Sequence, residues 1–522
     1  MYRHLDLSPD ERLPEDVISF IHGSDTLFLG TYYDAGEDGE RFSSHVGMNQ
    51  RGGKPGFARV RPSDGRTLVI PDYSGMSTIR SPCQENLHFV QGNRLLTSLG
   101  NIEATPLAGV TFVSFVTGAV LYLTGDAHNL IGHTAQRLMP RINALTTIHV
   151  TGYIFVEDAL PVRQKQGTQA LRSPYSPPVR LLAEEITSTY FVDNIEETPN
   201  VTLARIEVHS RDIATFTFES LRHVNVIPGQ AAILDFKSFV GALSYQHMAP
   251  GNPASVNDDR IRTWTVSRSS RWAGSSADCT DAGSGTSPVS FTLTMRHKPE
   301  GVVTSALFAI ARQLAEFRPE LLGDARPLQL NVPLVGIVGD FTLPRDTDAC
   351  SSTHGEEPSA HAGTRKWLWI AGGIGVTPFL AMLAGLRERK NRREGGDADD
   401  ITLVLSTREP DVLLPLVIRA LECTGNHLWE GRRGTLSIHV FSRSLASSPA
   451  LVNTASQSVL AVEVTQHTDR LSEDSLRALD IDNIQERGTY VCGPEDFERV
   501  VLTALKEMGV DSRNIRREGF TY

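Results

Sequence analysis

Apolar and polar positions follow two different patterns along the chain. From about residue 365 to the end, short apolar runs alternate with longer stretches in which apolar positions recur with a helical period. Runs of this length and order predict strands and helices in alternation, which build a parallel sheet covered on both faces. The expected strands are 368–371, 402–406, 436–441 and 489–492, and the expected helices are 377–389, 412–421, 472–479 and 494–508.

The preceding two thirds of the chain contain many strand-like segments separated by turn residues. One helix is expected near the start, at 14–22, and a second, apolar helix at 306–314. Many strands and few helices predict a closed antiparallel barrel in the first block and a second β domain after it. The expected strands are 26–32, 67–70, 109–115 and 120–124 in the first block, and 202–208, 214–218, 231–236, 263–267, 290–295 and 334–338 in the second.

The length of 522 residues suits about three domains of roughly 100–200 residues each. We expect them at 1–155, 198–345 and 365–522. A stretch rich in Pro, Ser and Gln marks a linker within 156–197, and a polar stretch without apolar periodicity, 346–364, marks a loop.

The charge, the apolar content, and the cysteine and histidine spacing of the chain argue against several classes of function. The net charge of −11 argues against broad binding to nucleic acid or to an anionic membrane surface. No apolar run of about 20 residues predicts a membrane span, and the acidic N-terminus predicts neither a signal nor a transit peptide, so we expect a cytoplasmic protein. The histidines show no metal-ligand spacing. The cysteines are scattered, which predicts neither a disulfide framework nor an iron–sulfur cluster; they are Cys83, Cys279, Cys350, Cys423 and Cys492.

The most informative segment is a glycine turn between an apolar strand and a helix. Gly372, Gly373 and Gly375 precede the helix that starts near Thr377. Glycines let a backbone approach a diphosphate, and the N–H groups and positive dipole end of the helix favour an anion. A second turn, 492–494 (Cys-Gly-Pro), follows a later strand. Because carboxyl ends of parallel strands meet at one edge, the two turns together predict a nucleotide site.

A second set of motifs lies in the middle block. Residues 262–267 (Arg-Thr-Trp-Thr-Val-Ser) read as a strand, in which Arg262, Trp264 and Val266 point to one face and the residues between them to the other. Gly301 begins a helix whose N-terminus suits a phosphate. A Pro-Gly-Gln turn at 228–230 precedes one strand, and Gly339 follows another.

In this region the chain resembles the ferredoxin–NADP reductase family of flavoproteins. The resemblance rests on the flavin strand R-x-Y-[ST]-x-S, the P-G-Q turn, the G-x-x-S/T helix start, the G-G-x-G-x-T-P turn, the C-G-P turn and an aromatic C-terminus. These elements occur in this order across about 198–522. The resemblance implies an antiparallel β-barrel that binds FAD, followed by an α/β domain that binds NAD(P).

The resemblance also implies residue roles around the FAD. Arg262 would hold the diphosphate together with Gly301, Val303 and Thr304. Trp264 would pack against the flavin, where the family usually has Tyr, so the phenol hydrogen bond is lost while stacking is kept. Groups of Thr265 and Ser267 would face the flavin edge near N5. A surface ion pair for Arg262 and a core position for Trp264 are the simpler alternatives.

Further residues would place the nicotinamide against the flavin. They are Thr377, Pro378, Cys492, Gly493 and Pro494. Cys492 has no adjacent base in its motif, so we interpret it as a positioning group. Glu518 is a candidate catalytic residue in the terminal run 518–522 (Glu-Gly-Phe-Thr-Tyr). Phe520 or Tyr522 would shield the flavin face, unless this tail is frayed.

Coenzyme choice depends on two strand ends. Arg408 follows the strand at 402–406, and Ser442 and Arg443 follow the strand at 436–441. A Ser-Arg pair there resembles the 2′-phosphate site of NADPH-specific relatives, and the arginine fork suits a phosphate. Glu409 is near and would favour NADH, so the sequence favours NADPH and leaves NADH open.

The first block resembles the flavin-binding split barrels of the pyridoxamine 5′-phosphate oxidase type. The resemblance rests on the runs at 51–60, 70–75, 92–94 and 99–102. It implies that Arg59, Ser74, Asn93 and Arg94 hold the phosphate of an FMN, and that a homodimer forms. A barrel without flavin and with surface arginines is the alternative.

Residues 76–91 interrupt this second pattern. The related run is close to Tyr-Ser-Gly-Asn, whereas here 16 residues, Met76 to Gln91, separate Gly75 from Gly92. We interpret the insert as a retained intron whose removal rejoins Gly-Asn in frame. A mature transcript that encodes Cys83 would contradict this. If it is translated, the insert interrupts the proposed phosphate site.

These patterns predict a flavin-dependent NAD(P)H oxidoreductase. Electrons would pass onward to an FMN in the first block, to a small substrate or to a redox partner protein. Two alternatives stay open: a FAD-only reductase with an inert N-terminal barrel, and a non-catalytic nucleotide-binding protein.

Overall fold

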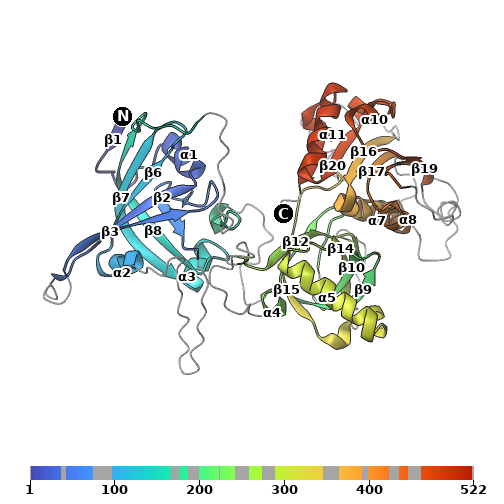
Figure 1. Ribbon diagram of the computed structural model, residues 1–522, viewed down its shortest axis with the longest axis horizontal. Coiled ribbons are helices and arrows are strands. Elements are labelled where there is room, and N and C mark those ends of the chain that lie inside the picture. The colour runs from blue at the N-terminus through green and yellow to red at the C-terminus, as the bar shows by residue number, and fades with distance from the viewer. Residues whose placement is uncertain are drawn as a thin grey trace, which may run out of the picture. The chain divides into compact units, whose positions relative to one another are not determined.

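The structure is a computed structural model that describes residues 2–36, 43–73, 97–165, 176–185, 199–222, 224–240, 255, 258–272, 288–344, 364–390, 398–421, 434–444 and 460–519. The chain divides into two compact units. The first comprises residues 1–189 and 242–259, and the second comprises residues 190–241 and 260–522. Figure 1 shows the helices and strands of each unit.

The first unit is built on one antiparallel sheet. Its strands are β1 (Tyr2–His4), β2 (Thr26–Tyr33), β3 (His45–Gly52), β4 (Arg59–Val60), β5 (Thr67–Pro71), β6 (Leu107–Val113), β7 (Val120–Ile131) and β8 (Ala144–Val156). They pair in the order β3-β2-β6-β7-β8-β5-β4, and β1 also pairs with β8. The short helices are α1 (Glu15–Gly23), α2 (Thr97–Ala104) and α3 (His133–Leu138).

Alternating burial fixes the inner face of this sheet. Along β2 every second residue is buried up to Thr31, and Leu27 and Leu29 join a core with Phe112, Leu121 and Ile148. Helix α1 covers this core with Val17 and Ile21, which lie one helical turn apart on one face. The helix predicted at 14–22 and the strands predicted at 26–32 and 67–70 are present within a residue or two.

The second unit begins with another antiparallel sheet. Its strands are β9 (Asn200–Val208), β10 (Ile213–Ser220), β11 (Ala231–Asp235), β12 (Ile261–Thr265), β13 (Arg268–Ser269), β14 (Val289–Arg296) and β15 (Asn331–Val338), in the order β12-β11-β15-β9-β10-β14-β13. The helices are α4 (Lys237–Val240), α5 (Val302–Phe317) and α6 (Glu320–Gly323). The core lies between the sheet and α5, where Phe216 meets Phe308 edge to face at 5.8 Å.

A parallel sheet completes the second unit. Its strands are β16 (Arg365–Gly372), β17 (Asp399–Ser406), β18 (Gly434–Phe441), β19 (Ala461–His467), β20 (Gly488–Gly493) and β21 (Ile515–Gly519), in the order β19-β18-β17-β16-β20-β21. Successive strands run outward from β16 to β19, and the chain then returns to the other side of β16. The strand order therefore reverses between β16 and β20, and ligands of such sheets bind at the carboxyl ends of the strands at this point.

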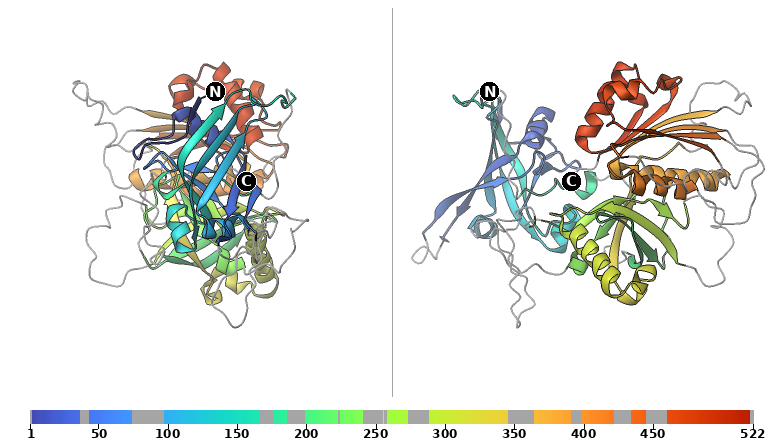
Figure 2. Two further views of the ribbon diagram at one scale, coloured as in Figure 1. Left: turned by 90° about the vertical axis from the view of Figure 1, so that its left-hand side faces the viewer. Right: turned by 45° about the vertical axis from the view of Figure 1, so that its right-hand side comes forward.

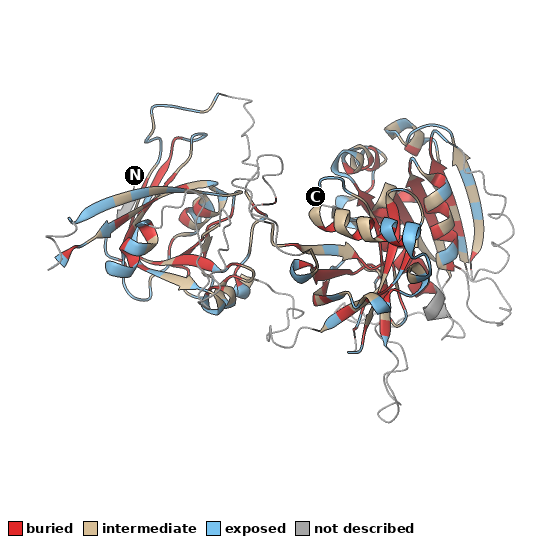
Figure 3. Cartoon of the chain, turned by 60° about the horizontal axis from the view of Figure 1, so that its bottom comes forward, coloured by how far each residue is buried: buried red, intermediate tan, exposed pale blue. Residues whose placement is uncertain are grey.

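Helices cover both faces of the parallel sheet (Figures 1 and 2). On one face α7 (Thr377–Lys390) and α8 (Pro410–Leu421) pack on Trp369, Leu403 and Ile438. On the other face α10 (Glu473–Arg477) and α11 (Glu495–Glu507) pack on Leu368, Ile370 and Val404. Figure 3 shows the resulting concentration of buried residues in the central strands, as expected for strands that read as continuous apolar runs.

The predicted fold class is therefore present in the second unit: an antiparallel β domain followed by a parallel α/β domain. The helix predicted at 472–479 is shorter, because Ser472 caps α10 and the helix ends at Arg477. Strands β1, β3, β4, β8, β13, β19 and β21 were not predicted. In the described part of the chain, no helix is long and apolar enough to cross a membrane.

Candidate functional site

The two glycine turns lie side by side at the carboxyl ends of β16 and β20. Ala371 pairs with Cys492, so the turn at 372–375 and the turn at 492–494 start at the same level of the sheet. A β-carbon on Gly375 would lie 2.3 Å from the carbonyl oxygen of Cys492. Gly372 and Gly493 both pack on the ring of Phe497, where a β-carbon would come within 2.7 Å and 2.5 Å. Only residues without a β-carbon allow this close packing.

Thr377 and Pro378 begin helix α7 directly after these turns. Residues 373–376 form a 3₁₀ turn, η8 (Gly373–Val376), and no side chain caps it at Gly372. Thr377 is buried at the start of α7. Proline is well tolerated in the first turn of a helix, where its missing N–H would have no partner. The predicted nucleotide turn therefore has the strand–turn–helix setting that the motif requires.

Two acids, Glu518 and Glu498, act on the buried thiol of Cys492. Cys492 is 0% exposed, and its Cα pairs with that of Glu518 across β20 and β21. Burial raises the pKa of the thiol well above its usual value, and Glu518 and Glu498 raise it further. A thiol with a raised pKa stays protonated at neutral pH and is a poor nucleophile.

Glu518 itself holds a proton more tightly than an ordinary glutamate. Burial raises its pKa to about 7, and the charge of Asp340 adds to the shift. Its buried Oε2 atom has no hydrogen-bond partner within the described residues. A buried polar atom without a partner costs about 1–3 kcal/mol, so this carboxyl group is suited to bonding a ligand.

The predicted coenzyme arginines also reach this sheet edge. Ser406 and Phe441, the last residues of β17 and β18, are register partners. Arg408 and Arg443 follow them and are exposed. Ser442 is buried, and its hydroxyl accepts the N–H of Ser444 at 3.3 Å. The register therefore places two exposed guanidinium-bearing residues just beyond neighbouring strand ends.

Glu409, the acid that could favour NADH, has two side-chain partners. Its carboxylate is paired with Arg296 and accepts the hydroxyl of Ser210 at 3.1 Å. Both partners belong to the antiparallel sheet region, so Glu409 is held toward that part of the second unit.

The predicted flavin strand ends earlier than expected. β12 ends at Thr265, and the chain then changes its hydrogen-bonding partner from β11 to β14. The N–H of Val266 donates to the carbonyl oxygen of Gln230, and the N–H of Ser267 donates to that of Thr292. Val266 is buried in the core, and Trp264 packs against the same core, as expected for two residues that share one face. The change of partner strand from β11 to β14 ends β12 two residues before the predicted limit at 267.

Trp264 and Arg262 retain partly exposed positions on β12. The Trp264 ring is half-buried and meets Phe236 edge to face at 5.5 Å. Arg262 is also half-buried, and its guanidinium donates to the carbonyl oxygen of Ile261 at 3.0 Å.

The two hydroxyls predicted to face the flavin differ. Thr265 is 3% exposed, and its buried Oγ1 atom has no hydrogen-bond partner in the described part of the chain. Ser267 is 4% exposed, and its hydroxyl is bonded to Thr292 and Thr294 at 2.9–3.1 Å. Thr265 therefore has a hydroxyl available to a ligand, whereas that of Ser267 joins the two strands.

The predicted phosphate helix is α5. Gly301 is its N-cap, and no side chain bonds the N–H groups of the first turn. Val303 is buried in the core, while the hydroxyl of Thr304 turns back to the carbonyl oxygen of Lys298 at 3.2 Å. The first-turn N–H groups fit an anion, because nothing else among the described side chains satisfies them.

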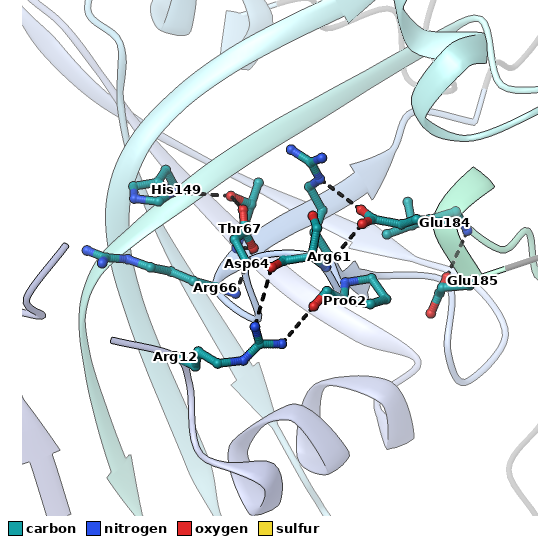
Figure 4. Close-up of polar contacts among 11 residues, drawn as sticks. Arg12, Arg61, Pro62, Asp64, Arg66, Thr67, His149, Glu184 and Glu185 are labelled. Carbon is teal, nitrogen blue, oxygen red and sulfur yellow. Dashed lines mark hydrogen bonds and ion pairs between the residues drawn. The ribbon is translucent and has the colours of Figure 1, made fainter. Parts of the chain in front are cut away.

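In the first unit, Arg59 is held by an acid of the linker. Its Nε atom donates to both carboxylate oxygens of Glu185 at 3.0 Å, and its NH2 group makes a third contact. The neighbouring Glu184 accepts from Arg61 at 2.9 Å and from the N–H of Ser63 at 3.0 Å (Figure 4). A short helical turn, η2 (Ala183–Glu185), thus presents two carboxylates to the arginines of β4 and the following turn.

Several predicted site residues lie outside the described residues. They are Ser74, Asn93, Arg94, Phe520 and Tyr522, together with the insert at 76–91 and Cys83, Cys279, Cys350 and Cys423.

Four further residues were not predicted as site residues. Glu498 lies in the first turn of α11, and its buried Oε1 atom has no hydrogen-bond partner among the residues that the structure describes. Asp340 raises the pKa of Glu518. In the first unit, burial raises the pKa of Asp72 to about 6, and the buried hydroxyl of Tyr73 has no partner within the described residues. Only Asp340, in the Gly-Asp-Phe run after a strand, carried a sequence signal.

No protein-family model matches the chain, and no curated protein matches it in sequence. Solved structures show distant likenesses. The Flavohem-like FAD/NAD-binding domain of nitric oxide dioxygenase from Vibrio cholerae O1 biovar El Tor is 14% identical over 62% of this chain and 98% of its own, with a TM-score of 0.34. A ferredoxin NADP⁺ reductase from Neisseria gonorrhoeae with bound FAD and NADP is 11% identical over 62% of this chain and 99% of its own, with a TM-score of 0.34.

An Amycolatopsis cytochrome P450 reductase is 16% identical over 62% of this chain and 69% of its own, with a TM-score of 0.35. At these identities and TM-scores the likenesses establish neither the family nor the function of this chain.

Proposed function

We propose that the second unit is a flavin-dependent oxidoreductase that oxidises NAD(P)H with a bound FAD. The observation that carries the proposal is the pair of glycine turns at the strand-order reversal, with Gly375 packed on the Cys492 carbonyl group. This arrangement presents backbone N–H groups and the start of α7 to a diphosphate at the place where nucleotides bind in such sheets.

The residues present fit a flavin as well as a nicotinamide nucleotide. The hydroxyl of Thr265, which has no partner among the described residues, would bond a flavin ring edge, and the first turn of α5 would bond a diphosphate. Arg262 and Trp264 lie on the same strand as Thr265. When bound, the two cofactors supply the hydride chemistry, and the protein supplies position and electrostatics.

The chain's own groups would orient the reacting rings and hold a proton. The buried Cys492 thiol stays neutral and packs beside the nicotinamide position, and Thr377, Pro378, Gly493 and Pro494 shape that position. Glu518, with a pKa of about 7, holds its carboxyl proton near neutral pH. A neutral acid avoids an uncompensated charge in a buried site and can bond an amide.

NADPH is the proposed donor. Arg408 and Arg443 are exposed beyond neighbouring strand ends, and Glu409 is paired with Arg296. Electrons would pass onward to an FMN in a split barrel formed by the first unit, to a small substrate or to a redox partner. For the FMN, Arg59, Ser74, Asn93 and Arg94 stay candidates, and Glu185 competes for Arg59.

The test is the visible spectrum of the purified full chain, with acid-released flavin quantified as FAD and FMN. FAD at one equivalent, bleached anaerobically by NADPH faster than by NADH, is the expected result. FAD without FMN indicates a FAD-only reductase with an inert first unit. Colourless protein that takes up no FAD would contradict the proposal and favour a non-catalytic nucleotide-binding protein.

A further inference from the structure

Glu409 stands directly beside a proposed coenzyme-binding arginine. It follows Arg408 at the carboxyl end of β17 and precedes α8. Its N–H donates to the Thr407 hydroxyl at 3.0 Å, and its carbonyl oxygen accepts from Val412 and Leu413 at 3.1 Å. The backbone of Glu409 is thus fixed from both sides, so the direction of its side chain decides where its charge lies.

The side chain is directed to the antiparallel sheet. Arg296, the last residue of β14, contacts the Glu409 carboxylate with NH2 and donates to Asp212 Oδ2 at 2.8 Å with NH1. Ser210 Oγ donates at 3.1 Å to Glu409 Oε1 and lies at the same distance from Asp212 Oδ1. One guanidinium and one hydroxyl therefore join two carboxylates from two sheets of the same unit.

The charges of Arg296, Glu409 and Asp212 indicate the effect of these contacts. Two carboxylates and one guanidinium carry a net charge of −1, and removal of the guanidinium would leave −2 next to Arg408. A free carboxylate beyond such a strand suits the 2′-hydroxyl of NADH and repels the 2′-phosphate of NADPH.

We infer that Arg296 is a specificity-determining residue. It neutralises Glu409 and holds it away from the ribose, so that Arg408 and Arg443 meet a 2′-phosphate without a competing acid. The inference rests on the proposed function, and it assigns coenzyme choice in part to a residue of the antiparallel sheet. Arg296 acts through Glu409 and is a positioning residue, not a catalytic one.

The variant Arg296→Gln tests the inference. The ratio of kcat/KM for NADPH to that for NADH should fall by about tenfold. This is the size expected when the Glu409 carboxylate loses its partner near the protein surface, where solvent screens part of its charge. Adding Glu409→Gln to Arg296→Gln should restore the ratio, because the exposed charge is then gone. Arg296→Lys, which keeps the charge, should retain most of the NADPH preference.

A binding measurement separates this effect from catalysis. In calorimetric titrations, Arg296→Gln should weaken the binding of adenosine 2′,5′-bisphosphate and should leave the binding of 5′-AMP unchanged. Asp212→Asn is the matched control, since it removes the other carboxylate and leaves the Arg296–Glu409 pair; its selectivity should stay at or above the wild-type value.

Three results would overturn the inference: equal weakening of both nucleotides in Arg296→Gln, no recovery in the double variant, or a shift of Glu409→Gln alone toward NADH. If Arg296→Gln does not fold, the single variant Glu409→Gln decides, because the inference requires it to keep or raise the NADPH preference. A wild-type protein that oxidises neither coenzyme and binds neither nucleotide would instead contradict the proposed function itself.

Discussion

Gly375 and Cys492 approach each other so closely that a β-carbon on the glycine would lie 2.3 Å from the carbonyl oxygen of the cysteine. The obstacle is backbone, fixed by the pairing of β16 with β20 through Ala371 and Cys492. It cannot move without disturbing the central pair of strands, so the two turns hold each other in position.

The variant Gly375→Ala should therefore be destabilised by about 1–3 kcal/mol, the usual cost of overpacking, and should bind NADPH at least tenfold more weakly. Urea unfolding and nucleotide titration measure the two effects. Gly323→Ala is the control, because a β-carbon there meets nothing within 4 Å. Unchanged stability and affinity in Gly375→Ala would contradict the predicted nucleotide turn.

Glu518 should make stability depend on pH. Burial, followed by Asp340, raises its pKa from 4.5 to about 7. Because the unfolded state loses this proton first, stability should fall as pH rises from about 4.5 through 7, by about 3 kcal/mol at 1.36 kcal/mol per pKa unit. Urea midpoints at pH 5 and pH 8 should differ less in Glu518→Gln than in the wild type.

The variant Asp340→Asn refines this test. It removes the smaller cause of the shift, so the fall in stability should move to a lower pH without disappearing. If Glu518→Gln retains the full pH dependence, another group is responsible.

The variant Thr265→Val should affect stability and flavin binding in opposite directions. It removes a buried hydroxyl that has no partner in the described part of the chain, so the flavin-free protein should gain up to about 1–3 kcal/mol. If the hydroxyl serves the flavin, FAD binding and flavin reduction by NADPH should weaken. Apo-protein unfolding and flavin fluorescence measure the two effects.

Ser267→Ala is the matched comparison. Its hydroxyl is bonded to Thr292 and Thr294, so its loss should lower the stability of the flavin-free protein. Equal behaviour of the two variants would show that neither hydroxyl is reserved for a ligand.

Arg443→Gln and Arg408→Gln should each raise KM for NADPH by about tenfold, because a guanidinium–phosphate contact is lost, and should leave KM for NADH nearly unchanged. The effect should shrink with added salt, since the residues are exposed. Arg499→Gln removes an exposed arginine of α11, paired with Asp496, and controls for net charge. An equal loss for both coenzymes would remove these residues from the 2′-phosphate site.

Glu185→Gln should increase the affinity of the protein for FMN, because a carboxylate no longer competes for Arg59. Loss of one partner of a largely buried ion pair should also lower stability, by about 3 kcal/mol. FMN fluorescence titration and urea unfolding measure these effects. Glu184→Gln, which releases Arg61 instead, should leave FMN affinity unchanged; equal FMN affinity in all three proteins would argue against a phosphate at Arg59.

The sequence by itself predicted most of the longer strands and helices of the second unit, because they rest on local rules, but it did not predict β13, β19 and β21. Apolar runs bounded by glycine predict buried parallel strands, and the glycine and proline residues at 372–375 and 492–494 predict the two turns. The edge strands β3 and β19 escaped prediction because their burial pattern is weak, with much of each strand exposed or half-buried.

Tertiary structure alone decided which polar groups are satisfied. Thr265 and Ser267 look alike in the sequence. After the change of partner strand from β11 to β14, the Ser267 hydroxyl is bonded, whereas that of Thr265 has no partner within the described ranges. Arg59 is paired with Glu185, a linker acid 126 positions away, and the sequence pattern gave no sign of this partner. Glu409 and Arg296 are 113 positions apart, and their pairing follows only from the packing of two sheets. Charge neutralisation acts through space, and a pattern along the chain cannot encode it.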